Sequence, residues 1–189
     1  MSPRMLLSVA LLLASALSAY PLGAAQATGF SIQQVELHEQ AGQILLNART
    51  TLAFSPVALE ALDHGVPLTL VFHAQLRRVG SWIWEDSLLD DQWRCIIRYR
   101  PLSERYEVYR LPGHQRQEFV TRDTAIRALS ELTDQLLIAR DRLDPKSDYE
   151  LRLKVSLDIE ELPLPLRPTA YLRPSWKLSS GWTTWPVKP

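Results

Sequence analysis

The sequence contains few of the residues that hold a fold together covalently or through metal. Cys95 is the only cysteine, so no disulfide can form within the chain and stability must come from packing. The four histidines have no metal-ligand spacing, and no HExxH or CxxC motif occurs. GxSxG, GxxxxGK[ST] and an SxxK set with its companions are also missing. We therefore expect no resident metal, no cofactor and no known catalytic constellation.

An excess of charge of one sign is lacking as well. The chain has 21 basic and 21 acidic residues. Nucleic-acid-binding domains usually carry a clear basic excess, so nothing here favours a nucleic acid as partner.

The N-terminus is the most informative segment that is present. Arg4 precedes an apolar run over residues 5–17, and Ala25-Gln26-Ala27 follows with small residues at the positions that a signal peptidase reads. A run of 13 residues is shorter than the roughly 20 that span a bilayer. We predict a secretory signal over residues 1–27 and a single periplasmic domain over residues 28–189. Cleavage of the leader and its retention as an anchor both stay open.

Alternation of apolar and polar residues indicates several strands with one buried face, which is typical of antiparallel sheets. The pattern runs through residues 44–54, 66–78, 92–100 and 149–159, and Phe30–Leu37 shows it with a slip that predicts a bulge at Gln33-Gln34. Residues 105–111 are the expected hairpin partner of 92–100. Cys95 falls on the apolar face of its strand, which predicts a buried and inert thiol.

Two helical segments are predicted between the strands. Ser55 as N-cap, Pro56 and closing Gly65 indicate a short helical turn, and apolar residues at helical spacing indicate a modest helix over Thr121–Thr133. The tail from Pro163 has six of the 13 prolines, so we expect an edge strand, turns or an extended wrap there. The predicted fold is a mainly antiparallel β-sandwich, immunoglobulin-like, with an open barrel as the alternative.

Arginines and tryptophans supply the candidate binding residues. Arg94, Arg98 and Arg100 share one strand face, and Arg77 lies on the polar face of the preceding strand, so pairing would gather guanidinium groups that suit phosphate or carboxylate. A solvated face paired with acidic neighbours is the alternative. Trp82 and Trp84 flank an acidic segment and are candidates for stacking on a ligand, whereas Trp93, Trp176 and Trp182 are expected to fill the core.

Several segments together resemble a known family. They are Ala61–Leu68 with the sequence ALDHGVPL, Trp82-Ile83-Trp84, Tyr99–Tyr106, Leu157–Leu166 and Trp176–Trp182. This set resembles the proteobacterial domain-of-unknown-function family 4390 over most of residues 30–186. The resemblance implies a secreted, single-domain protein with an envelope location, whose gene often neighbours that of a membrane sensor kinase. It transfers no catalytic or binding residue.

These observations favour a non-catalytic protein of the cell envelope that binds a protein partner or an anionic envelope component. A carbohydrate- or lipid-binding module that uses exposed tryptophans is the first alternative. An envelope hydrolase with scattered carboxylates is the second, and it lacks every motif that would support it.

Overall fold

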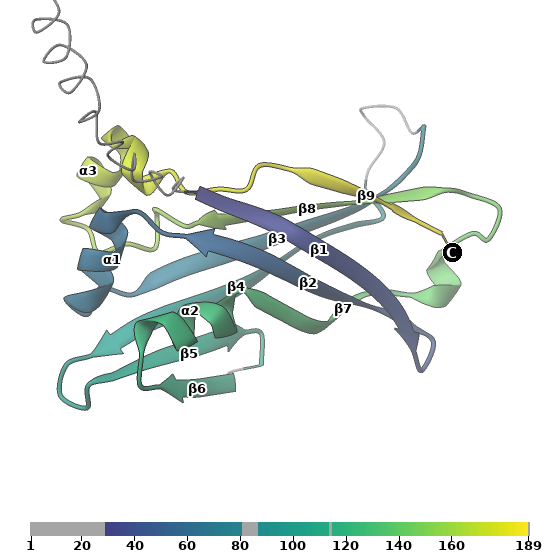
Figure 1. Cartoon of the computed structure of the whole chain (residues 1–189). Helices are drawn as coiled ribbons and strands as arrows, with labels where there is room; N and C mark the ends of the chain where they lie inside the picture. The colour runs from purple at the N-terminus through teal and green to yellow at the C-terminus, as the bar shows by residue number, and fades with distance from the viewer. Residues whose placement is uncertain (1–28, 81–86, 114, 189) are drawn as a thin grey trace, which may run out of the picture.

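The computed structural model describes residues 29–80, 87–113 and 115–188, which form two antiparallel β-sheets packed face to face (Figure 1). The smaller sheet has the order β1-β2-β7, from β1 (Gly29–Gln40), β2 (Gln43–Ala53) and β7 (Glu131–Ala139). The larger sheet has the order β6-β5-β4-β3-β8-β9. Its strands are β3 (Leu68–Arg78), β4 (Leu89–Arg100), β5 (Arg105–Leu111), β6 (Gln115–Phe119), β8 (Tyr149–Leu157) and β9 (Thr183–Val187). The predicted mainly antiparallel β class is confirmed.

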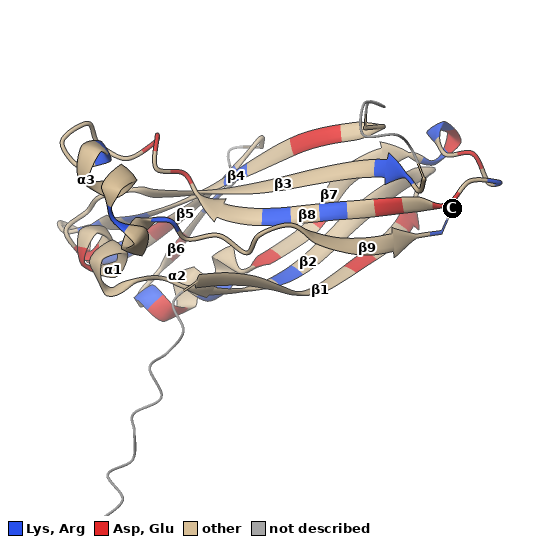
Figure 2. Cartoon of the chain, turned by 90° about the horizontal axis from the view of Figure 1, so that it is seen from above, with Lys and Arg blue, Asp and Glu red and all other residues tan. Residues whose placement is uncertain are grey.

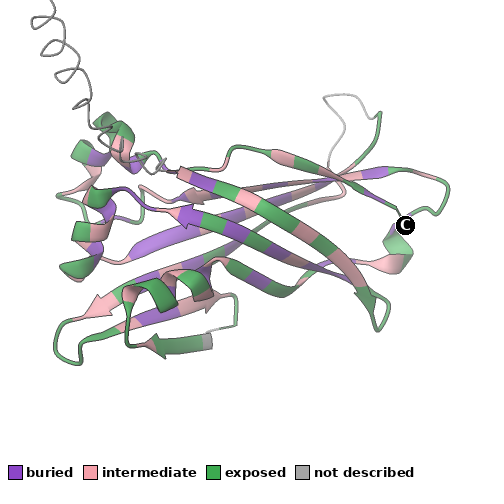
Figure 3. Ribbon diagram, viewed as in Figure 1, coloured by how far each residue is buried: buried purple, intermediate pink, exposed green. Residues whose placement is uncertain are grey.

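The long strands β2, β3 and β8 each have one apolar face that is buried between the sheets, whereas in β1 only Phe30 is buried (Figure 3). In β3 the inward residues are completely buried, namely Leu68, Leu70, Phe72, Ala74 and Leu76. The inward residues of β2 and β8 complete the same core. The register of β1 against β2 shifts between Ile32 and Gln34, which confirms the predicted bulge.

The short helix α1 (Pro56–Asp63) begins as its sequence predicts. The Ser55 hydroxyl accepts a hydrogen bond from the Ala58 N–H at 3.2 Å, and proline occupies the first helical position. Gly65 follows with φ of 83°, a left-handed conformation that a residue with a Cβ adopts at a cost. This turn lets the chain enter β3 directly after the helix.

The second helix is shorter than the sequence suggested. α2 (Arg122–Leu129) begins where predicted, with Thr121 as its N-cap, but it ends at Leu129, so the expectation of a helix reaching Thr133 was wrong. Residues from Glu131 onward form β7, which pairs with β2. The pairing satisfies the backbone groups of this segment and buries Leu132, and it therefore overrides the helical spacing.

The proline-rich tail mixes an edge strand with helical turns. β9 pairs with β8 and confirms the expected edge strand, while α3 (Arg167–Leu172) and the 3₁₀ turn η2 (Pro174–Trp176) were not anticipated. A second 3₁₀ turn, η1 (Arg140–Arg142), follows β7. α1 and α3 lie together at one end of the sandwich, and the chain terminus labelled C lies at the other (Figure 1). Over the described residues no helix combines the length and apolar character required to cross a bilayer.

Candidate functional site

The arginines of β4 lie on the outer face of the larger sheet. Trp93, Cys95 and Ile97 point into the core, so the alternate positions of Arg94, Arg98 and Arg100 face outward. The register with β5 places Arg98 opposite Glu107 and Arg100 opposite Arg105. Alternation along β4 thus places these three guanidinium groups on one surface, as their spacing predicted.

Arg77 does not belong to this group. The register of β3 places Val71 opposite Arg94, and Arg77 lies six residues further along the strand, opposite Glu150 of β8. At 3.3 Å per residue the separation along the strand is about 20 Å. Trp82 and Trp84 lie outside the described residues.

Arg110 occupies the opposite face of β5, beneath α2. Its guanidinium donates to the Ala128 and Glu131 carbonyl oxygens, the latter at 3.2 Å. These acceptors lie at and just beyond the C-terminal end of α2, where a cation is favoured by the helix dipole. Arg110 therefore has a structural role and is not part of the outer arginine surface.

A buried carboxylate organises the outer arginines. The side chain of Glu107 is only 3% exposed, and it accepts hydrogen bonds from Arg100 Nε at 2.8 Å and from the Tyr109 hydroxyl at 2.5 Å. Arg116 of β6 pairs with the other carboxylate oxygen at 2.7 Å. Burial alone would raise the pKa of Glu107, but the Tyr109 and Arg100 hydrogen bonds and the two positive charges hold that pKa below its usual range.

The arginines surround a hollow of about 400 Å³ beside the turn between β4 and β5, lined by Arg98, Arg100, Pro101, Leu102, Ser103, Glu107 and Arg116. Arg100 donates to Glu107 through its Nε and also interacts with the Tyr109 hydroxyl, which leaves further guanidinium N–H donors for a ligand. Within the described part of the chain, the side chain of Arg98 forms no hydrogen bond or ion pair. We call these residues the arginine hollow. Its three guanidinium groups outnumber the two carboxylates that pair with them, Glu107 and Glu118, and they suit an anion that accepts forked hydrogen bonds.

Sequence reasoning treated Glu107 only as an acidic neighbour that could pair with the arginines, and it did not identify Arg116. Arg116 lies on the short polar strand β6, and only the β5–β6 register, which places Arg116 opposite Tyr109, brings its guanidinium to Glu107. The sequence did contain a signal for this contact. If Pro112-Gly113 is assumed to form a hairpin, Glu107 faces the charged residues Arg116 and Glu118 of the returning strand.

Trp182 also differs from the sequence prediction. It was expected to fill the core, but it is 37% exposed and lies over the outer face of β3 and β8. Its ring is 4.8 Å from that of His73 and about 5 Å from the cationic groups of Arg152 and Lys154. Figure 2 shows these basic positions as bands along β8, next to β9. The chain runs along the edge of β8 on its way to β9, and at residue 182 it places the ring over the outer face of the sheet instead of in the core. Trp93 and Trp176 are buried as predicted.

His73 is held beneath this ring by a carboxylate. Its Nε2 lies 2.5 Å from Asp90 Oδ1, and Gln75 donates to the other Asp90 oxygen at 2.8 Å. The hydrogen bond with His73 is the main reason that the pKa of Asp90 lies below its ordinary value. The cluster is a rigid polar support for Trp182.

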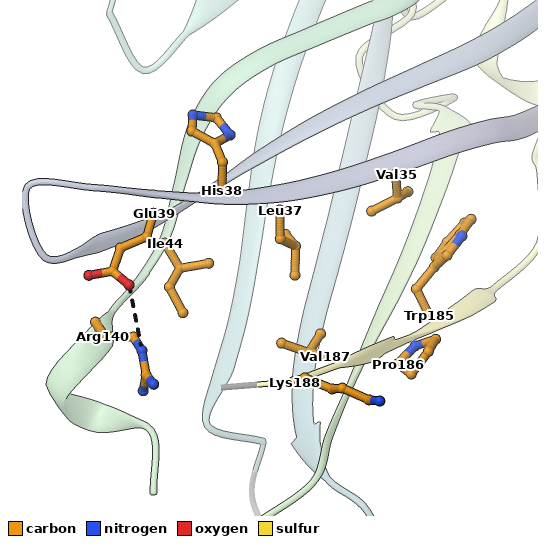
Figure 4. Close-up of a pocket in the computed structure, with 10 residues that line it drawn as sticks. All are labelled: Val35, Leu37, His38, Glu39, Ile44, Arg140, Trp185, Pro186, Val187 and Lys188. Atoms are coloured by element: carbon orange, nitrogen blue, oxygen red, sulfur yellow. Dashed lines mark ion pairs between the residues drawn. The ribbon is translucent and has the colours of Figure 1, made fainter. Parts of the chain in front are cut away.

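A separate cleft lies where the edges of the two sheets meet (Figure 4). It has a volume of about 450 Å³ and is lined from one side by β1 and from the other by β9, with Arg140 of η1 at its end. Val35 and Leu37 point into the space toward Trp185 and Val187 (Figure 4). The sequence did not predict this cleft, because its walls come from strands that are about 150 residues apart in the chain.

Groups suited to catalysis do not gather at these places. Cys95 is 2% exposed, and burial raises the pKa of its thiol to about 11, so the reactive thiolate is scarce at neutral pH. In the described residues, no three His, Cys, Asp or Glu side chains come together as a metal site. The arrangement can bind and orient a ligand, and the residues placed here do not form a nucleophile–base pair.

The fold and these surfaces define an antiparallel two-sheet β domain with an arginine-lined hollow and an inter-sheet cleft. The chain belongs to the DUF4390 family, a domain of unknown function, whose profile matches residues 27–186. No curated protein and no solved structure is significantly similar to the chain.

Proposed function

We propose that this chain is a non-catalytic binding protein of the cell envelope that recognises the phosphate group of an anionic envelope component in the arginine hollow. The observation that carries the proposal is the buried Glu107 carboxylate, which holds Arg100 and Arg116 in place beside Arg98. Arginines that are fixed before the ligand arrives lose less conformational entropy on binding. The signal-like N-terminus supports a location outside the cytoplasm.

The surroundings of the hollow suit a phospholipid headgroup. Leu102 lines the hollow and is fully exposed at the tip of the β4–β5 turn. An exposed leucine beside several cations is the combination that interfacial membrane-binding segments use. Inorganic phosphate has the same anionic group as a phospholipid but no acyl chains for Leu102 to contact. Binding of the two ligands can therefore be distinguished by experiment.

The test compares binding of the purified protein to vesicles of phosphatidylglycerol, to vesicles of phosphatidylcholine and to inorganic phosphate. Cosedimentation measures vesicle binding, and ³¹P line broadening measures phosphate binding. Arg98→Ala is the informative variant because the Arg98 side chain forms no hydrogen bond or ion pair with Glu107. Its removal should therefore leave the fold intact. We expect Arg98→Ala to weaken phosphatidylglycerol binding at least tenfold, since a hydrogen bond to a charged group contributes about 1.5–3 kcal/mol.

Arg94→Ala is the matched control, because Arg94 lies on the same strand and face but does not line the hollow. Equal losses in both variants would mean diffuse attraction and would refute recognition in the hollow. Binding of phosphate without vesicle binding identifies the isolated anion as sufficient. Binding to neither anionic probe would reject the proposal.

A second candidate function, recognition of an acidic glycan, rests on Trp182. Its exposed ring beside Arg152 and Lys154 combines a stacking surface with positive charge. Titration with an acidic oligosaccharide should change indole fluorescence in the native protein and not in Trp182→Phe. An unchanged spectrum in the native protein would remove this candidate.

A further inference from the structure

The inter-sheet cleft is a site distinct from the arginine hollow, and six of its ten lining residues are apolar. Val35 and Leu37 of β1 and the buried Ile44 of β2 form one side, while Trp185 and Val187 of β9 form the other. Figure 4 shows the side chains of Val35 and Leu37 on the β9-facing side of β1 and His38 on the opposite side. The cleft therefore continues the hydrophobic core outward between the two sheet edges.

The charged residues of the lining are Glu39, Arg140 and Lys188, of which Glu39 and Arg140 lie together and Lys188 comes from the β9 side (Figure 4). Arg140 lies at the end of the cleft, where its backbone N–H donates to the Gly42 carbonyl oxygen at 2.9 Å and so fixes η1 over the β1–β2 hairpin. Its Nε is 3.7 Å from a Glu39 oxygen, which is beyond hydrogen-bond length. The terminal nitrogens of Arg140 therefore keep donors for another acceptor.

Lys188 adds a second positive charge to the lining. With the described residues its ammonium group forms no ion pair or hydrogen bond. Arg140 and Lys188 against Glu39 leave one net positive charge, which one anionic group would balance. An apolar slot with a positive end complements a molecule that has an apolar chain and one negative head.

We propose that the cleft binds a single-chain fatty acid, with its carboxylate at Arg140 and Lys188 and its acyl chain between Leu37 and Trp185. Ligand sites in proteins usually have volumes of roughly 300–1,000 Å³ and mostly apolar walls with a few polar groups. A volume of about 450 Å³ is in the lower part of that range and suits one chain better than two.

An extended peptide fits the cleft less well. Peptides that add to a sheet use the free main-chain groups of an edge strand. β1 and β9 are edge strands, but the space between them is lined by side chains, so a peptide inside the cleft would meet side chains and not a free main-chain edge (Figure 4). Polar backbone groups left without partners in an apolar site cost free energy, which an acyl chain avoids.

Trp185 provides a local test of where the chain binds. A dibrominated stearic acid quenches indoles that contact its acyl chain, so titration should quench part of the tryptophan fluorescence of the native protein. Trp185→Phe keeps an aromatic wall but removes this indole, and we expect the quenching to fall while native mass spectrometry still detects the bound acid. Unchanged quenching in Trp185→Phe would place the ligand elsewhere and overturn the proposal.

The charged end is tested with palmitic acid and hexadecanol, which share a chain length and differ in the head group. Arg140→Gln combined with Lys188→Gln should weaken palmitic acid binding about tenfold, as expected for hydrogen bonds to a charged group, and leave hexadecanol binding unchanged. Arg142→Gln is the matched control, because Arg142 is in the same 3₁₀ turn and does not line the cleft.

Three results would overturn this inference: absence of palmitic acid binding to the native protein, equal binding to the double variant, or equal losses for acid and alcohol. Circular dichroism of each variant verifies that the fold is intact. The phosphate assay on the arginine hollow is independent, so the failure of one proposal is distinguishable from the failure of the other.

Discussion

Replacement of Glu107 by glutamine tests whether one buried carboxylate holds the arginine hollow together. The substitution keeps the shape of the side chain and an oxygen that can accept from Tyr109, but it removes the negative charge between Arg100 and Arg116. Glu107 receives three charge-assisted contacts at 2.5–2.8 Å. Each hydrogen bond that involves a charged group contributes about 1.5–3 kcal/mol to stability.

The net cost is smaller than the sum because the arginine side chains are 41% and 49% exposed and regain water when the carboxylate is lost. We expect Glu107→Gln to lower the free energy of unfolding by about 2 kcal/mol at pH 7, which for a domain of this size lowers Tm by about 4–8 °C. Urea denaturation of the native protein and of Glu107→Gln measures this difference in the free energy of unfolding, provided that the two proteins have equal m-values. Glu118→Gln is the control, since Glu118 also pairs with Arg116 but is half exposed.

The pH dependence of this difference has a defined sign. The pKa of Glu107 is lower in the folded protein than its ordinary value of 4.5, so its stabilising contribution is complete above that pH and is lost as pH falls through the folded pKa. The difference in the free energy of unfolding between the native protein and Glu107→Gln should therefore be constant from pH 8 to about pH 5.5 and should decrease in more acidic solution. A difference below about 0.5 kcal/mol at pH 7, or one that increases as pH falls, would refute the role assigned to Glu107.

Three further predictions concern the framework. Because burial raises the Cys95 pKa to about 11, about one thiol in 3,000 is ionised at pH 7.5, and a disulfide reagent should modify Cys95 only on unfolding; rapid modification of the native protein would contradict its burial. Arg110→Ala should lower the free energy of unfolding by about 1–2 kcal/mol, because two carbonyl groups at the end of α2 lose their donor. Arg94→Ala is the control and should lower it by less than about 0.5 kcal/mol, both measured by urea denaturation. Gly65→Ala should lower stability by about 1 kcal/mol, since φ is 83° there; an unchanged midpoint would mean that the turn adjusts freely.

The strands were predictable because burial of one face imposes a two-residue period that no other element shares. Segments whose apolar residues fit both the strand period and the helix period were not predictable. Leu132 is at helical spacing from Leu129 and Ala125, yet it also fits an inward position of a strand, and only the free edge of β2 decides between them. Likewise the prolines of the tail predicted an edge strand, turns or an extended wrap, although proline is tolerated in the first turn of a helix, where Pro168 lies in α3.

The candidate sites follow the same division. The outward positions of Arg98 and Arg100 depend only on alternation within β4, and the sequence was sufficient to predict them. The partners that turn them into a hollow depend on the register of β5 against β4 and β6, which alternation does not encode. Exposure of Trp182 depends on the path of the tail along β8, which is equally non-local.

The unequal size of the two sheets explains why the cleft exists. Three strands cannot cover the inner face of six, so the uncovered part must be closed by something else. Over β4, β5 and β6 the closing element is α2, which buries Ala125 and Leu129. At the opposite edge β1 alone faces β8 and β9, and the space between β1 and β9 has no helix of the described chain above it. An apolar region that the fold leaves open at one edge, while it covers the equivalent region at the other, is where a ligand can complete the core.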